Sequence, residues 1–101
     1  MKTIIQLFLL AVSTSCIFPS YAETNTKQIE ALVFNCYTCH GTDGKSPGEI
    51  PKLTGLSSKK IEEKLHLFRL DQSQATIMNR IAKGYTKEEI KAIADYLASL
   101  K

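Results

Sequence analysis

Hydrophobic residues recur every three or four positions shortly after residue 25, as on one face of a helix. The recurring positions are Ile29, Leu32, Val33 and Cys36. Asn25 or Thr26 can cap such a helix, because their side chains accept hydrogen bonds from the first free backbone N–H groups. The pattern predicts a helix over residues 26–36.

Two further helical segments follow in the middle of the chain. Ser57 or Ser58 can cap the first of them, whose hydrophobic face comprises Ile61, Leu65 and Phe68. We expect a helix over residues 59–70. A short helical turn is expected over residues 77–83, ending at Gly84, since glycine often follows a helix C-terminus.

The last segment has the clearest helical pattern. Thr86 and Glu89 have the spacing of a capping box, in which each side chain bonds the backbone of the other residue. The hydrophobic positions that follow are Ile90, Ile93, Ala94, Leu97 and Leu100. The pattern predicts a helix over residues 87–100, and because no strand pattern appears elsewhere, the expected fold class is all-α.

Residues 40–57 interrupt the helical pattern with helix-breaking residues. The glycines and prolines of this stretch are Gly41, Gly44, Pro47, Gly48, Pro51 and Gly55. The composition predicts a long loop. A loop of this length is unusual in a small domain unless it is functional.

The first residues resemble an export signal. Lys2 precedes an apolar run over residues 4–12, and small residues lead up to Ala22. We expect a signal peptide over residues 1–22, cleaved after Ala22, which leaves a domain over residues 23–101 in the periplasm. An uncleaved membrane anchor is less favoured because a span needs about 20 apolar residues. A lipoprotein cut before Cys16 is also less favoured, because the usual leucine is missing.

Length and charge limit the function further. With 101 residues, the chain has room for one domain, and a domain this small usually needs a disulfide, a metal or a cofactor to fold stably. The formal net charge is +3. The basic residues are interspersed with acidic ones and form no basic stripe, so nucleic acid is not an expected partner.

The run Cys36-Tyr37-Thr38-Cys39-His40 is a C-x-x-C-H motif, the attachment signal for c-type haem. At this spacing the thiols of Cys36 and Cys39 can reach the two vinyl groups on one edge of a porphyrin. His40 then falls beneath the iron as an axial ligand. The motif predicts one covalent haem c, which would complete the core of this small domain.

Paired cysteines have two other common uses. A redox-active dithiol of the thioredoxin type is expected within a βαβ pattern, which this chain lacks. A zinc site needs two further ligands. After cleavage, the only other cysteine or histidine is His66.

Candidates for the second axial ligand are few. Met78 is the only methionine besides Met1, and it lies beyond the long loop and the second predicted helix, so the chain can return to the other face of a haem. Methionine with histidine is the ligand pair of cytochromes c. A buried core methionine is the alternative use of Met78. His66 is the rival ligand, although an ordinary half-exposed helical histidine is favoured. Pro51 can supply a carbonyl that orients His40, or can simply form a turn.

These features together resemble the class I monohaem cytochromes c over the whole of residues 23–101. The resemblance rests on the motif ending at His40, the Pro51/Leu53/Gly55 pattern, Met78, and Tyr96-Leu97 in the last helix. It implies the cytochrome c fold, in which short helices wrap around one covalent haem. It also implies that the first and last helices cross, and that the long loop covers the side of the haem bound by histidine.

The stretch from Thr76 to Tyr85, followed by a helix that starts at a threonine, is similar to one subfamily. It resembles the cytochrome subunits of flavocytochrome c sulfide dehydrogenases, although Asn79 stands where glycine is common. The resemblance implies Met78 as the distal iron ligand. It also implies an FAD-containing flavoprotein partner that oxidises sulfide and passes electrons to this haem, so the chain would have no substrate site of its own.

Three functions follow from these expectations. The first is one-electron transfer in the periplasm as the haem subunit of such a flavoprotein. The alternative is a free, soluble cytochrome that carries electrons between respiratory complexes or to another periplasmic redox partner. A gas-binding sensor would require that Met78 leave the iron open.

Overall fold

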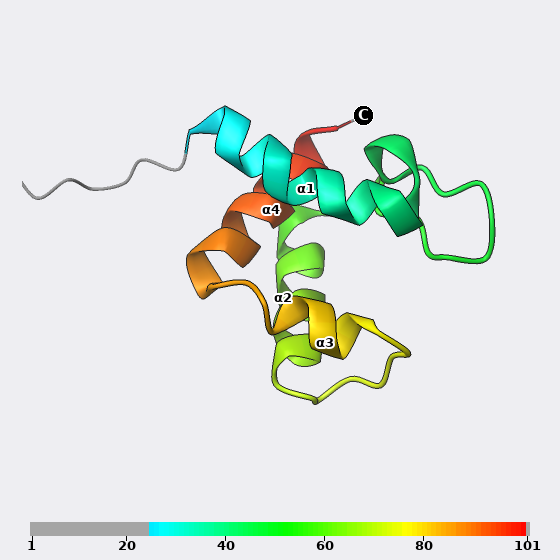
Figure 1. The fold of residues 1–101 in the computed structure, drawn as a ribbon, viewed down its shortest axis with the longest axis vertical. Coiled ribbons are helices and arrows are strands. Elements are labelled where there is room, and N and C mark those ends of the chain that lie inside the picture. The colour runs from blue at the N-terminus through cyan, green and yellow to red at the C-terminus, as the bar shows by residue number, and fades with distance from the viewer. Residues whose placement is uncertain (1–24, 101) are drawn as a thin grey trace, which may run out of the picture.

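The computed structural model describes residues 25–100, so the expected signal peptide and its cleavage site at Ala22 lie outside the described residues (Figure 1). The elements are α1 (Thr26–His40), the 3-10 turn η1 (Thr42–Gly44), α2 (Ser58–Arg69), α3 (Met78–Ala82) and α4 (Lys87–Ser99). Residues 25–100 contain no strand, which agrees with the all-α prediction.

The first helix begins as predicted but ends later. The Asn25 side chain accepts a hydrogen bond from the backbone N–H of Gln28 at 3.0 Å. The predicted end at residue 36 is wrong, because α1 continues to His40. The first helix-breaking residue is Gly41, which has φ +80°. The C-x-x-C-H motif is therefore helical.

The later helices have bounds within one residue of the prediction, and for α2 and α4 the side-chain caps explain why. The Ser57 side chain accepts the Lys60 N–H at 3.2 Å at the start of α2. Both bonds of the predicted capping box are present at the start of α4: the Glu89 N–H donates to the Thr86 hydroxyl, and the Thr86 N–H donates to the Glu89 carboxylate. The predicted loop over residues 40–57 is confirmed apart from His40, which belongs to α1, and the short turn η1.

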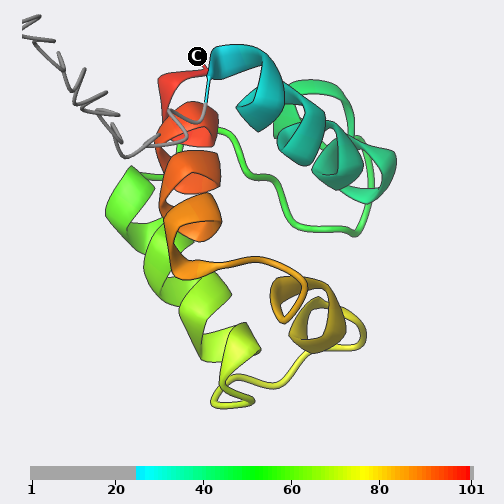
Figure 2. The same ribbon diagram turned by 60° about the vertical axis from the view of Figure 1, so that its left-hand side comes forward.

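Helices α1, α2 and α4 enclose the core. α2 and α4 lie side by side, and α1 packs against α4 (Figures 1 and 2). The buried residues of the main cluster are Val33, Ile61, Ile93, Ala94 and Leu97. All five belong to the hydrophobic patterns that predicted the three helices.

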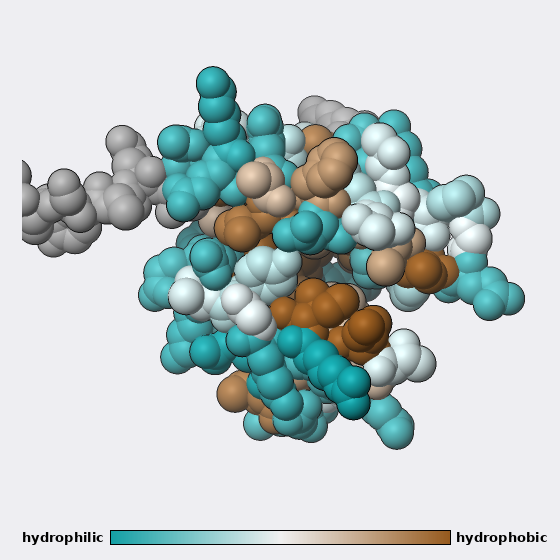
Figure 3. Space-filling view, viewed as in Figure 1, coloured by the Kyte–Doolittle hydropathy of each residue, from teal (hydrophilic) through white to brown (hydrophobic). Residues whose placement is uncertain are grey.

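Helix α3 lies apart from this core. It packs against α2, near the end of α2 that is farther from α1 (Figures 1 and 2). Between α1 and α3 the surface is recessed, and hydrophobic side chains gather at this recess (Figure 3). Over residues 25–100, every helix is too short or too polar to cross a membrane.

Candidate haem site

Cys36 and Cys39 lie on the last turns of α1, three residues apart, so their side chains are neighbours on one face of the helix. Both are free thiols; Cys36 is half-buried and Cys39 is exposed. For the zinc alternative, residues 25–100 gather no group of three or more histidine, cysteine, aspartate or glutamate side chains. The two thiols are thus neighbours near the C-terminal end of α1 and do not form a disulfide.

Burial raises the pKa of the Cys36 thiol, although a backbone hydrogen bond partly opposes this. Reactive dithiols of the thioredoxin type have lowered pKa values, because their chemistry needs a thiolate. The environment of Cys36 therefore differs from that of a redox-active dithiol.

His40 is the last residue of α1, and its side chain is buried. Its ring Nδ1 lies 2.6 Å from the carbonyl oxygen of Pro51. A histidine that donates its Nδ1–H to a carbonyl keeps a lone pair on Nε2, which can bind a metal, and has its ring orientation fixed. The loop thus provides His40 with the hydrogen bond typical of a metal-binding histidine.

The loop over residues 41–53, called here the His40 loop, is held mainly by backbone hydrogen bonds. The N–H of Ser46 donates to the His40 carbonyl at 2.8 Å, and the N–H of Leu53 donates to the Gly44 carbonyl at 2.8 Å. The buried Ser46 hydroxyl donates to the Ile50 carbonyl. No pattern in the sequence points to Ser46, because its hydrogen-bond partners are set by the path of the loop.

Two glycines allow this path. Gly41 and Gly44 have φ of +80° and +70°, values that other residues rarely adopt. A Cβ atom on Gly41 would lie 2.9 Å from the Ser46 backbone nitrogen, and one on Gly44 would lie 2.7 Å from the Leu53 Cβ. Glycine is therefore required at both positions for the loop to return beneath His40.

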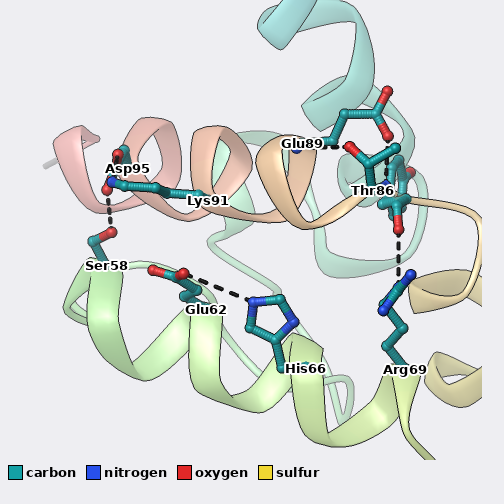
Figure 4. Close-up of polar contacts among 9 residues, drawn as sticks. Ser58, Glu62, His66, Arg69, Thr86, Glu89, Lys91 and Asp95 are labelled. Atoms are coloured by element: carbon teal, nitrogen blue, oxygen red, sulfur yellow. Dashed lines mark hydrogen bonds and ion pairs between the residues drawn. The ribbon is translucent and has the colours of Figure 1, made fainter.

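The two candidates for the second axial ligand lie on different helices. Met78 is half-buried and is the first residue of α3. His66 lies in α2, half-exposed as predicted, and its Nε2 is 3.7 Å from a carboxylate oxygen of Glu62 one turn earlier (Figure 4). His66 therefore pairs with a side chain of its own helix.

The residues present fit a large apolar cofactor. Large hydrophobic side chains remain exposed on α1, the His40 loop, α2 and the segment around α3; they are Phe34, Ile50, Leu67, Leu70, Ile77 and Ile81. Hydrophobic side chains also gather beside the recess between α1 and α3 (Figure 3). A c-type haem needs two neighbouring thiols for attachment, a histidine for its iron and apolar surroundings for its ring. The residues described here provide all three.

Comparison with known proteins agrees with this chemistry. The family model for cytochrome c matches residues 26–101. The chain belongs to the cytochrome c family. It is therefore an electron carrier with one covalent c-type haem, and Cys36 and Cys39 are present for the attachment.

Several characterised cytochromes are similar to this chain. The cytochrome subunit of sulfide dehydrogenase from Chlorobaculum tepidum is 42% identical over 81% of this chain and 74% of its own length. Cytochrome c-552 of Acidithiobacillus ferridurans is 40% identical over 64% of this chain, but only 28% of its own length is covered. Cytochrome c-553 of Helicobacter pylori strain J99 is 36% identical over 72% of this chain and 78% of its own length.

Proposed function

We propose that this cytochrome transfers single electrons through a haem that Cys36 and Cys39 would attach and whose iron His40 and Met78 would bind. When bound, the haem supplies reversible one-electron chemistry at its iron. The protein orients His40 through the Pro51 carbonyl, 2.6 Å from Nδ1. As a ligand of that iron, the thioether of Met78 would favour the reduced state and raise the reduction potential. The two cysteines tether the cofactor to the end of α1.

The proposed electron donor is an FAD-containing flavoprotein that oxidises sulfide. The observation that carries this proposal is the 42% identity, over 81% of the chain, to a cytochrome subunit of sulfide dehydrogenase. In this assignment the chain binds no sulfide itself. Its residues hold the haem, exclude water from it and present it to the flavoprotein.

A free electron shuttle is the second candidate. It is supported by the 36% identity to cytochrome c-553 of H. pylori, whose name refers to no enzyme complex. The two functions differ in the expected contact surface. A permanent subunit buries a large apolar interface, whereas a shuttle makes small and transient contacts.

We further propose that residues 1–22 are a signal peptide and that residues 23–101 form the cytochrome domain in the periplasm. The apolar run over residues 4–12 behind Lys2 supports this. Mass spectrometry of the purified holoprotein tests it directly. A chain that begins at Glu23 is expected, and a chain that retains Lys2 or begins at Cys16 would contradict it.

The partner is tested by the flavin-to-haem ratio of the protein purified gently from its native cells. Flavin that comigrates with covalent haem in one size-exclusion peak, together with haem reduction on addition of sulfide, is the expected result. Haem alone at the size of a monomer would overturn the subunit assignment and favour the shuttle. The flavin-free cytochrome serves as the control, since it should not be reduced rapidly by sulfide.

A further inference from the structure

We propose that Asn79 is a positioning residue for Met78: its side-chain amide fastens α3 to α2 and so keeps the methionine sulfur at the iron. The inference rests on the proposed ligation by Met78. It concerns which contacts hold that ligand in place.

Helix α3 has little means of holding itself. It has five residues and no side-chain hydrogen bond at its N-cap, Ile77. Isolated helices shorter than about 12 residues are marginal in water. The turn bonds at its two ends stay within the segment: the Arg80 N–H donates to the Ile77 carbonyl, and the Gly84 N–H donates to the Ile81 carbonyl. The placement of Met78 therefore depends on side chains that cross to α2.

Asn79 makes the side-chain hydrogen bonds closest to Met78, and we call these contacts the Asn79 tie. Its Nδ2 lies 2.8 Å from the carbonyl oxygen of Ser73 and 3.3 Å from that of Phe68, and both contacts are partly buried. Both acceptors are backbone atoms, one in the last turn of α2 and one in the connection to α3. A primary amide has two N–H donors, so one side chain can hold both at once.

Two other ties hold the far end of the segment. The Nε of Arg69 donates to the carbonyl of Tyr85 at 3.2 Å, and Lys83 pairs with Asp71 at 2.5 Å (Figure 4 shows Arg69). The Lys83–Asp71 pair is exposed, and exposed pairs contribute little. Of Asn79, Arg69 and Lys83, only Asn79 is adjacent to Met78 in the sequence. Its loss should therefore displace the methionine sulfur before it unfolds the helices.

The hydrogen-bond chemistry of Asn79 suggests a variant that removes both donated bonds and keeps the shape of the side chain. Aspartate has the shape of asparagine, but its ionised carboxylate can only accept hydrogen bonds. Asn79→Asp would place a carboxylate against two carbonyl oxygens. Asn79→Gly would remove these hydrogen bonds without adding charge.

The experiment heats the oxidised holoprotein and follows two signals: the far-red sulfur-to-iron band, which reports methionine ligation, and far-UV circular dichroism, which reports helices. In Asn79→Asp we expect the band to disappear at a clearly lower temperature than the helices do. At 25 °C the fraction lacking the band should rise about tenfold, equivalent to about 1.4 kcal/mol. The reduced variant should also bind carbon monoxide faster than the wild type.

Gln74→Glu is the matched control. Gln74 is exposed in the same connection between α2 and α3, and the substitution makes the same change from amide to carboxylate. We expect both melting curves of this control to match those of the wild type. A control that loses the band as Asn79→Asp does would show that added charge, and not the tie, is responsible, and would overturn the proposal.

Other outcomes are equally decisive. If the band and the helices of Asn79→Asp melt together, or if the band is unaffected, Asn79 has no positioning role. If the variant does not accumulate, Asn79→Gly replaces it, and failure of both to fold would show that Asn79 supports the whole fold instead. Met78→Ala separates the two claims: a band that persists in Met78→Ala refutes ligation by Met78, whereas a band lost there but heat-stable in Asn79→Asp refutes only the role of Asn79.

Discussion

His40 ends a fifteen-residue helix and lies 2.6 Å from a backbone carbonyl of a loop held by backbone hydrogen bonds, whereas Met78 begins a five-residue helix tied to α2 by side chains. The two sides of the proposed haem site are thus built by different means. Backbone bonds in the His40 loop require particular glycines and a particular path. Side-chain ties at α3 require particular functional groups.

This difference indicates which of the two proposed iron ligands is lost first. The ring of His40 is buried and oriented by Pro51, so its position follows from the path of the chain. The position of Met78 depends on a few long-range side-chain contacts that can break while the helices stay intact. We expect ligand loss, on heating or mutation, to begin on the Met78 side.

The largest effect is expected from removing the tether on the His40 side. Cys36→Ala or Cys39→Ala should weaken or abolish covalent haem attachment and leave the chain largely unfolded, because the haem completes the core. Haem staining on a denaturing gel, with far-UV circular dichroism, measures both consequences. A well-folded haem-free variant would show that the core does not need the cofactor.

Removing the ligand on the other side should have a different kind of effect. Met78→Ala is expected to lower the reduction potential by a substantial fraction of the roughly 0.8 V range that axial ligands span, with the haem still attached. Redox titration measures the potential, and the denaturing gel measures attachment. Loss of covalent haem in this variant would mean that Met78 also serves the tether, against the separation of the two sides.

A smaller effect is expected from blocking the path of the His40 loop. Gly44→Ala combines φ +70° with a contact at 2.7 Å from the Leu53 Cβ, and such strain costs about 1–3 kcal/mol. Gly55→Ala is the matched control, because Gly55 has φ +79° and open space for a Cβ. Chemical denaturation of the two holoproteins should show the larger loss for Gly44→Ala. Equal losses would mean that the loop tolerates the close contact.

The smallest effect is expected between α2 and α4, away from both sides. Asp95 accepts hydrogen bonds from Lys91 and Ser58, which lower its pKa, most strongly through Lys91 (Figure 4). Because the native pKa lies below that of the unfolded chain, the contribution to stability is present above about pH 4 and is lost as the pH falls through the native value. Asp95→Asn should remove this pH dependence, and exposed pairs contribute less than about 1 kcal/mol.

Thermal unfolding of Asp95→Asn at several pH values measures this contribution, and the far-red band should be unchanged at neutral pH. A change in that band would connect α4 to the Met78 side and so blur the comparison.

The helices and their caps could be predicted because they depend on residues close together in the sequence. Thr86 and Glu89 are three residues apart, and Ser57 caps the turn that follows it. The end of α1 was placed too early because the hydrophobic repeat ends at Cys36, although nothing up to Gly41 breaks a helix. The C-x-x-C-H motif indicated the haem because its spacing brings two thiols and a histidine close together within five consecutive residues.

The remaining contacts were not visible in the sequence because they join distant residues. Asn79 reaches Phe68 and Ser73 only when α3 folds back on α2, and Ser46 reaches the Ile50 carbonyl only when the loop turns. Polar residues in such positions look the same in sequence as solvated ones. The proposed flavoprotein partner rests on resemblance alone, because the hydrophobic pattern and the motif describe the haem domain and not what docks on it.

The most direct test of this account is the far-red absorption spectrum of the oxidised wild-type holoprotein at neutral pH. The account predicts a sulfur-to-iron charge-transfer band, since Met78 should be bound opposite His40. Absence of this band at neutral pH would contradict the ligation by Met78 and, with it, the description of α3 as the second side of the haem site.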